Sequence, residues 1–401
     1  MRYIFFFLLL TTLSAEIIRA YVPNGESNSV SVIDISSNTV IATIAVGNAP
    51  RKDAVTPDGT KVYVTNAVSA NISIIDTASN TVIGTITTTS PSGIDITPDG
   101  TKAYVSNSTA NNVNVIDISS NTIIATIAVG DTPQNVAIAP NGAKAYIMNI
   151  GAVDNISVID ISTNTVIATI TAGDVPANLA ISPDSTRAYV VNQNDNNVSV
   201  IDTASNTVIA TVNVGNNPSD VAITFDQSKI YVTNGFNGNS VSVIDASSNL
   251  VIATIAVGTS PSGVAITPDN TKAYVSNRFS NNVSVIDIST NTVIATIAVG
   301  SGPRSFAITP NLFPANLTAQ RENILFPTQT DIVNILTWEK PFNSQYFNIY
   351  RDVNLTNLAG STTGTIFEDH SRAPEETDSY FITSINIYGN ESVSSSITIR
   401  D

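Results

Sequence analysis

One segment recurs seven times in this chain and constrains its fold more than any other feature. Each copy contains a variant of Lys-Ala-Tyr-Val-x-Asn, then Val-Ile-Asp, then Ser-Asn-Thr-Val-Ile-Ala-Thr-Ile. The repeat tyrosines lie 41–43 residues apart, at Tyr21, Tyr63, Tyr104, Tyr146, Tyr189, Tyr231 and Tyr274. A unit this short cannot bury its apolar faces alone, so it must stack against copies of itself.

One complete copy, residues 261–300, shows what each repeat builds. Its β-branched segments predict four strands, at Val264–Thr267, Lys272–Asn277, Val283–Asp287 and Thr292–Val299. Turn sequences rich in Pro, Asp, Ser and Asn separate these strands. Four antiparallel strands per repeat describe one propeller blade, so we expect an all-β fold with a seven-bladed β-propeller over residues 16–311.

The phase of the repeat predicts how the ring closes. The first copy begins at Arg19, inside the second strand of a blade, and the last ends at Thr309, inside a first strand. Each end of the repeat region therefore supplies what the other lacks. We predict that Phe306–Thr309 pairs with Arg19–Asn24, which joins the two ends of the ring and removes exposed strand edges there.

Charged residues follow the same period. A basic residue lies two positions before each repeat tyrosine, and an aspartate ends each third strand. If the second and third strands pair antiparallel, Lys102 faces Asp117, and the same pairing recurs in every copy. Exposed cross-strand pairs contribute only ~0.2–1 kcal/mol each. We interpret them as marks of strand register rather than as a functional ring of charge.

These motifs resemble a known repeat family. Tyr-Val-Thr-Asn stands at residues 63–66 and 231–234, and Val-Ile-Asp and Val-Gly-x-x-Pro elements accompany it. The region from 19 to 311 is similar to the YVTN β-propeller repeats of surface-layer and secreted proteins of archaea and bacteria. This resemblance implies a fold more firmly than an activity, because propellers carry many unrelated functions.

The composition changes after Asn311. Residues 312–401 contain the only Trp and the only His of the chain, with alternating segments that predict an antiparallel β-sandwich. The segments around Trp338 and Tyr380 resemble a fibronectin type III domain, which implies that both are core residues. In secreted bacterial proteins such domains act as spacers or adhesive units.

The N-terminus predicts export. Residues 1–15 combine Arg2, the apolar run Ile4–Leu10 and small or polar residues, as a secretory signal peptide does. The alternative is a short membrane anchor, although the apolar run is well below the ~18 residues that spanning requires. We expect a secreted, cell-surface or periplasmic protein with no transmembrane segment once the signal is removed.

Charge and composition narrow the partners. The net charge is −15, so the basic footprint of a nucleic-acid-binding protein is missing. The chain has no cysteine, which excludes thiolate metal sites and disulfides. We expect a monomer without a cofactor that binds an extracellular protein or glycan.

Candidate binding residues are those that depart from the repeat. The loops between second and third strands, together with the links between blades, vary among copies and belong to one face of the ring, here called the variable face. Outside the periodic set, the basic residues of the propeller all fall on this face, and they are Arg51, Lys52, Arg278 and Arg304. Arg51, Lys52 and Arg304 are expected to form one basic spot that attracts a carboxylate, phosphate or acidic glycan. The alternative is that they offset nearby acids and keep the surface soluble.

Four more residues break the pattern. Asp53 replaces an apolar residue and Asp95 an alanine of the strand nearest the axis, where a carboxylate must be paired, hydrated or bound to a cation. A Ca²⁺ or ligand site is one interpretation, and pairing with Lys52 or with water is the other. Phe236 and Phe279 are expected on the variable face, where they either contact a sugar or protein or pack within their loops.

The sequence therefore favours a non-catalytic binding or structural protein. The propeller contains no histidine, which excludes His-based triads there. The resemblance also touches propeller lactonases and streptogramin-lyase-like enzymes, whose His, Arg and acid clusters this chain cannot supply in full. An enzyme of lyase, lactonase or glycosidase type acting at the mouth of the channel stays the alternative, with Asp53 and Asp95 as its two acids.

Overall fold

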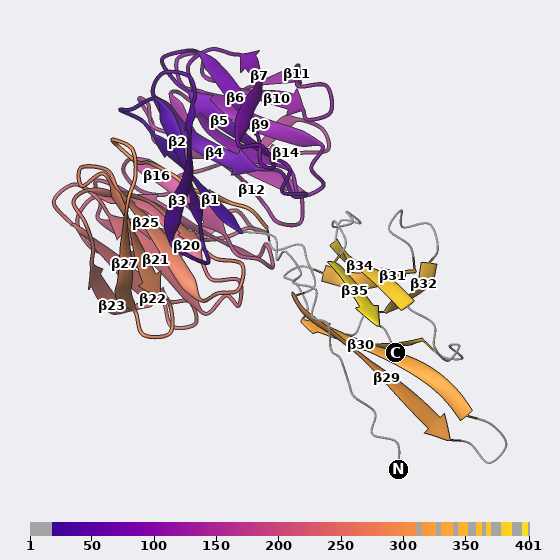
Figure 1. Ribbon diagram of the computed structural model, residues 1–401. Coiled ribbons are helices and arrows are strands. Elements are labelled where there is room, and N and C mark those ends of the chain that lie inside the picture. Colours follow the sequence, from indigo (N-terminus) through magenta and orange to yellow (C-terminus); the bar gives the residue numbers. More distant parts are fainter. Residues whose placement is uncertain are drawn as a thin grey trace. The chain divides into compact units, whose positions relative to one another are not determined.

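The protein is described from a computed structural model that covers residues 18–310, 315–325, 330–339, 344–351, 358–362, 366–369, 378–386 and 395–399 (Figure 1). The chain divides into two compact units, and one of them is Ile18–Pro310. Every regular element in the described residues is a β-strand. The predicted signal peptide, residues 1–15, lies outside the described residues.

The unit Ile18–Pro310 is a seven-bladed β-propeller, as predicted. Seven four-stranded antiparallel sheets form its blades, and blade 1 combines the two ends of the unit in the order β28-β1-β2-β3. Blades 2 to 7 each take four consecutive strands, from β4–β7 to β24–β27. The innermost strands are β28 (Ala307–Ile308), β4 (Pro50–Val55), β8 (Pro91–Ile96), β12 (Pro133–Ile138), β16 (Pro176–Ile181), β20 (Pro218–Ile223) and β24 (Pro261–Ile266).

The remaining strands follow the repeat motifs outward. The second strands are β1 (Arg19–Asn24), β5 (Lys61–Asn66), β9 (Lys102–Asn107), β13 (Lys144–Asn149), β17 (Arg187–Asn192), β21 (Lys229–Asn234) and β25 (Lys272–Asn277). The third strands are β2 (Ser29–Asp34), β6 (Asn71–Asp76), β10 (Asn112–Asp117), β14 (Asn155–Asp160), β18 (Asn197–Asp202), β22 (Ser240–Asp245) and β26 (Asn282–Asp287). The outer strands are β3 (Thr39–Ala45), β7 (Thr81–Thr87), β11 (Thr122–Ala128), β15 (Thr165–Ile170), β19 (Thr207–Asn213), β23 (Leu250–Ala256) and β27 (Thr292–Ala298).

The ring closes as the repeat phase predicts. Ala307 and Ile308 of β28 pair antiparallel with Tyr21 and Ala20 of β1. The pairing is shorter than the predicted Phe306–Thr309, but backbone hydrogen bonds extend it in both directions. The Thr309 N–H donates to the Arg19 carbonyl at 2.9 Å. Closure therefore joins the ends of the propeller within a single sheet.

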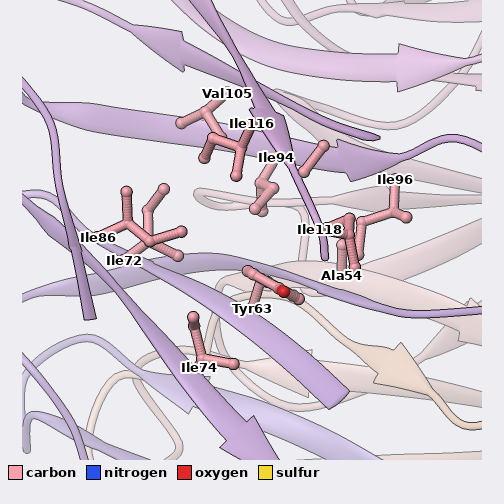
Figure 2. Packing of buried hydrophobic residues seen from close by; sticks show 11 residues of the cluster. Ala54, Tyr63, Ile72, Ile74, Ile86, Ile94, Ile96, Val105, Ile116 and Ile118 are labelled. Carbon is pink, nitrogen blue, oxygen red and sulfur yellow. The ribbon is translucent and has the colours of Figure 1, made fainter. Parts of the chain in front are cut away.

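The hydrophobic core lies between neighbouring blades rather than within them. Figure 2 shows Tyr63, Ile72 and Ile74 of blade 2 together with Ile94 and Ile116 of blade 3, members of one buried cluster. Alternate residues of a strand face the blades on its two sides. Val62 and Val64, which flank Tyr63, pack instead in the cluster shared with blade 1. This double burial explains why the middle strands are almost continuously apolar.

A hydrogen bond that joins five of the seven blades to the next accounts for the most repeated letters of the sequence. The buried Tyr63 hydroxyl donates to Asn121 Oδ1 of blade 3 at 2.6 Å, and Asn121 stands in a turn with φ +55°. Asparagine tolerates this left-handed conformation better than most residues. Four other blades make the same bond, namely Tyr21–Asn80, Tyr104–Asn164, Tyr231–Asn291 and Tyr274–Asn38.

The periodic charges have the predicted register but not the predicted partners. Lys102 stands opposite Asp117, and all seven copies pair in this way. Within residues 18–310, however, no ion pair joins these residues. The interpretation as cross-strand ion pairs is therefore wrong. Lys229 instead donates to the Ile288 carbonyl of the next blade at 2.7 Å, and Asp117 accepts hydrogen bonds from Ser119 and Ser120.

Each outer strand carries a β-bulge at the same place. In blade 3, Val115 pairs with Ala125 and Ile116 pairs with Ile123, so Ile124 has no partner in the strand ladder. The corresponding isoleucine is left out in every blade, and each is exposed, at Ile41, Ile83, Ile124, Ile167, Ile209, Ile252 and Ile294. A bulge bends the strand and increases its local twist.

The second unit contains two antiparallel sheets, which bear out the predicted sandwich. Their strands are β29 (Ala315–Leu325), β30 (Thr330–Glu339), β31 (Ser344–Tyr350), β32 (Leu358–Thr362), β33 (Ile366–Asp369), β34 (Asp378–Asn386) and β35 (Ser395–Ile399). The sheet orders are β29-β30-β33 and β32-β31-β34-β35. Leu336 of the first sheet packs with Phe347 and Tyr380 of the second. Tyr380 is a buried core residue as predicted, whereas the Trp338 side chain lies outside the described residues.

The inter-blade hydrogen bond is measurable because the chain offers a matched control. Asn249 occupies the same left-handed position, with φ +56°, but its buried Oδ1 accepts no hydrogen bond within residues 18–310. Asn121→Ala and Asn249→Ala should lose the same turn preference, but only the first leaves a buried tyrosine hydroxyl without its acceptor. We expect Asn121→Ala to unfold about 2–4 °C lower than Asn249→Ala, for a bond contributing ~1 kcal/mol. Equal melting temperatures by calorimetry would show that the bond contributes nothing.

Candidate functional site

The variable face owes many of its central side chains to a bulge at the start of six of the seven innermost strands. Pro50 pairs with Asn66, but the next regular pair joins Asp53 to Val64, so Arg51 and Lys52 are left out of the ladder. Proline has no N–H to donate to the strand ladder, so regular pairing is interrupted beside it. In a bulge the residue without a partner points its side chain in a new direction. Lys52 N donates to Thr65 Oγ1 at 3.1 Å, which explains the threonine of the Tyr-Val-Thr-Asn motif.

The structure brings three of the four predicted basic residues together. Arg51 follows Pro50, Arg304 follows Pro303 at the equivalent place of blade 1, and Arg278 begins the loop after β25. We call these three residues the arginine cluster. Arg51 Nη1 donates to Ser92 Oγ at 3.3 Å and to Gln134 Oε1 at 3.4 Å. Arg51 thus extends over the ends of blades 3 and 4.

The arginine cluster holds more positive charge than its surroundings neutralise. Burial and the charges of Arg278 and Arg51 lower the pKa of Arg304 to about 10, and burial together with Arg278 lowers the pKa of Arg51. One carboxylate opposes them, because Glu26 Oε1 accepts from Arg278 Nη2 at 3.3 Å. The buried Nε atoms of Arg278 and Arg304 have no hydrogen-bond partner in the propeller. An anion placed beside the cluster would relieve the mutual repulsion of the three guanidinium groups.

Apolar loop tips surround this charged centre. Phe279 is 51% exposed, and the Arg278 guanidinium carbon lies 5.2 Å from the centre of its ring. Phe236 occupies the equivalent tip in blade 6 and is also exposed, as are Val68 and Val153 on other loops of the face. The two phenylalanines therefore lie on the surface rather than packing within their loops. Aromatic side chains and arginines are both enriched at binding surfaces.

Lys52 does not join the arginine cluster as predicted. Its ammonium lies 3.8 Å from Asp220 Oδ2, and Asp220 belongs to β20 of blade 6. Blades 2 and 6 are three blades apart in a ring of seven, so this ion pair crosses the propeller axis. Asn178 Nδ2 also donates to Asp220 Oδ1. Asp220 was not among the residues predicted from the sequence. It stands at the position equivalent to Lys52 and carries the opposite charge, which was the signal available in the sequence.

The two predicted aspartates connect neighbouring blades instead of sharing a ligand. Asp53 is buried and accepts hydrogen bonds from Ser305 Oγ at 2.6 Å and from the Ala307 N–H of β28 at 2.9 Å. Asp95 accepts from the Ile138 N–H of β12 at 2.7 Å. The two carboxylates thus bond to opposite neighbours, blade 1 and blade 4. Within the residues that the structure describes, no three His, Cys, Asp or Glu side chains are grouped as metal ligands would be.

Burial makes the carboxyl groups of Asp53, Asp95 and Asp220 weaker acids than exposed aspartates. It raises the pKa of Asp53 to about 7 and the pKa of Asp95 to about 6, against the opposing effects of their hydrogen bonds and of the Lys52 charge. It also raises the pKa of Asp220. Lys52 therefore acts on three carboxylates from three blades, not on the Asp53 and Asp95 pair alone.

These carboxylates make the stability of the propeller depend on pH. Their folded-state pKa values lie above the unfolded value of 3.8, so the folded state binds more protons between those limits. The contribution of these protonated carboxyl groups to the free energy of unfolding is complete below pH 3.8. It is lost as the pH rises towards 7. We expect the melting temperature to fall between pH 5 and pH 8, and Asp53→Asn to raise it by roughly 2–6 °C at pH 8 only. An Asp53→Asn protein that melts lower than the wild type at pH 8 would contradict this, because asparagine can still accept from the Ala307 N–H and can donate its amide N–H to Ser305 Oγ.

No helix able to cross a bilayer is present in the part of the chain that the structure describes. The predicted absence of nucleic-acid partners stays a prediction, as do the expected monomer and the export of the protein.

Comparisons with known proteins agree on the fold. Two family models match parts of the propeller, a choice-of-anchor I domain over residues 126–308 and a YNCE-like beta-propeller over residues 58–144. A solved chain of Kuenenia stuttgartiensis hydrazine synthase is 26% identical, with a TM-score of 0.63 over 71% of this chain and 99% of that chain. A functionally unknown protein from Desulfotomaculum acetoxidans is 21% identical, with a TM-score of 0.64 over 72% and 98% of the two chains. No curated protein matches the sequence. The chain is thus a β-propeller repeat protein.

Proposed function

We propose that this protein is a non-catalytic, extracellular or cell-surface binding protein whose variable face engages an anionic glycan. The observation that carries the proposal is the arginine cluster, in which Arg51, Arg278 and Arg304 converge from three separate parts of the chain. Such a concentration of positive charge is unexpected in a chain of net charge −15 unless it serves a ligand. Its position on exposed loops of a rigid ring is where binding residues concentrate.

A uronic acid is the ligand that suits these groups best. Guanidinium groups bind carboxylates through two parallel hydrogen bonds, and the cluster supplies several guanidinium groups close together. The ring of Phe279, next to Arg278, offers a flat apolar surface to a sugar ring. An acidic protein segment is the other class of partner, and the experiment below distinguishes the two.

The location and the second domain belong to the same proposal. Residues 1–15 have the pattern of a signal peptide, and the YVTN resemblance is to proteins of the cell surface. The likeness of residues 312–401 to fibronectin type III domains favours a spacer that holds the propeller away from its point of attachment. Surface-layer membership is one form that this role would take.

An enzyme is the alternative. Asp53 and Asp95 are the candidate acids, and the pKa of each is raised, as the pKa of a general acid often is. The hydrogen bonds of these residues argue against this role. Asp53 uses both oxygens to hold Ser305 and Ala307 of the closing segment of blade 1, and Asp95 holds β12. We therefore favour a structural role for both.

Binding to a trimer of galacturonic acid tests the proposal. Calorimetric titration at low salt should show binding that weakens as salt is added, and no binding of neutral maltotriose. Arg51→Ala and Arg304→Ala should each weaken it by about tenfold, the loss expected for one charge-assisted hydrogen bond. Lys102→Ala removes the same charge from a periodic scaffold position and should leave binding unchanged.

Two results would count against the proposal. Affinity for the trimer that survives reversal of Arg51 and Arg304 to glutamate would show that the arginine cluster is not the site. Binding of hexaglutamate in the absence of binding to the sugar trimer would make the partner an acidic protein segment and not a glycan.

A further inference from the structure

The arginine cluster already contains one carboxylate, and that carboxylate is not part of the repeat. Glu26 Oε1 accepts from Arg278 Nη2 at 3.3 Å, and its negative charge raises the pKa of Arg304 against the effect of the other two arginines. The scaffold does not require an acid at this place in the loop. The equivalent residues of the other six blades are Val68, Thr109, Gly151, Asn194, Phe236 and Phe279.

A glycine in the neighbouring link makes room for Glu26. A Cβ atom at Gly302 would lie 2.8 Å from both Cγ and Cδ of Glu26, closer than a carbon contact allows. Gly302 has φ +68°, but this conformation is not what demands a glycine. The six equivalent residues have φ between 49° and 54° and all carry a Cβ atom, and they are Ala49, Ser90, Thr132, Val175, Asn217 and Ser260. Gly302 is therefore matched to the side chain of Glu26.

A second glycine accommodates the arginine. A Cβ atom at Gly25 would lie 2.4 Å from Arg304 Nε, so only glycine lets the Arg304 side chain pass over this loop. The backbone of the loop is held in place. Gly25 N donates to the Gly302 carbonyl at 2.8 Å, and Glu26 N donates to the Ser301 carbonyl at 3.1 Å. The Glu26 side chain can thus leave the cluster without any movement of the backbone.

We propose that Glu26 is an internal substitute for the carboxylate of the ligand, which occupies the arginine cluster in the free protein and is displaced when a uronic acid binds. The inference rests on the proposed function and adds to it a means of limiting the affinity for the ligand. Glu26 is 48% exposed and makes a single hydrogen bond to Arg278, so its displacement costs little. A ligand carboxylate then takes the place of Glu26 beside Arg278 and within the charge of Arg304.

Two variants remove the substitute by different means. Glu26→Gln abolishes its charge, and Gly302→Ala keeps the charge but pushes the side chain out of the cluster. Ala49→Gly is the matched control, because residue 49 is the counterpart of residue 302 in the adjacent link and has no glutamate beside it. Thermal unfolding of each variant establishes that the propeller is intact.

Titration of the galacturonic acid trimer at low salt gives the answer. Glu26→Gln and Gly302→Ala should each bind it about three- to tenfold more tightly than the wild type, while Ala49→Gly binds as the wild type does. If the wild type binds the trimer and both variants bind it equally or more weakly, this inference is overturned while the proposed function stands. If Arg51→Ala and Arg304→Ala bind as well as the wild type, the proposed function itself fails.

Discussion

The hydrogen bond from a buried tyrosine to the asparagine of the next blade is the contact on which the ring depends. The flat faces of neighbouring blades attract each other through apolar burial, which is not directional and sets no angle between them. Tyr63 and Asn121 supply a fixed point, since a buried hydroxyl must find a partner. Lys229 and four of its counterparts reach the carbonyls of the same turns, so each blade makes at least one of the two contacts that specify the rotation. Both contacts occur at the rim away from the variable face, which leaves that face free to change.

Most of the propeller could be predicted from the repeat, because periodicity reports which residues share an environment. Strand order, closure through β28 and β1, and the facing of Lys102 and Asp117 all follow from it. Periodicity does not report which partner a side chain prefers. Lys229 stands opposite Asp245, but the serines of the Asp245 turn donate to that carboxylate, and the Lys229 ammonium donates to the Ile288 carbonyl of the next blade. The choice of partner by such a lysine depends on distances between neighbouring blades, which the sequence of one repeat does not show.

The same limit applies to the candidate site. Arg51, Arg278 and Arg304 could be found by subtracting the repeat, since each is an exception to it. Lys52 was also an exception, but the bulge that releases it sends it to Asp220 across the axis. Asp220 escaped notice because the third position of the innermost strands varies among Lys, Gly, Asn, Asp and Ser, so no residue there is an exception. Glu26 was hidden in the same way, in a loop where every copy differs.

The seven bulges of the outer strands bear on how such a protein survives at high concentration. These strands end each blade with unpaired backbone groups, and their sequence, Thr-Val-Ile-Ala-Thr-Ile, lacks the lysine or proline that usually protects an edge. Closely similar neutral edges repeated seven times are also good templates for cross-β stacking. The unpaired isoleucine in each strand interrupts the regular spacing of donors and acceptors halfway along. A neighbouring chain could therefore add only a short and poorly aligned stretch, so the backbone itself, and not charge, guards this protein against fibre formation.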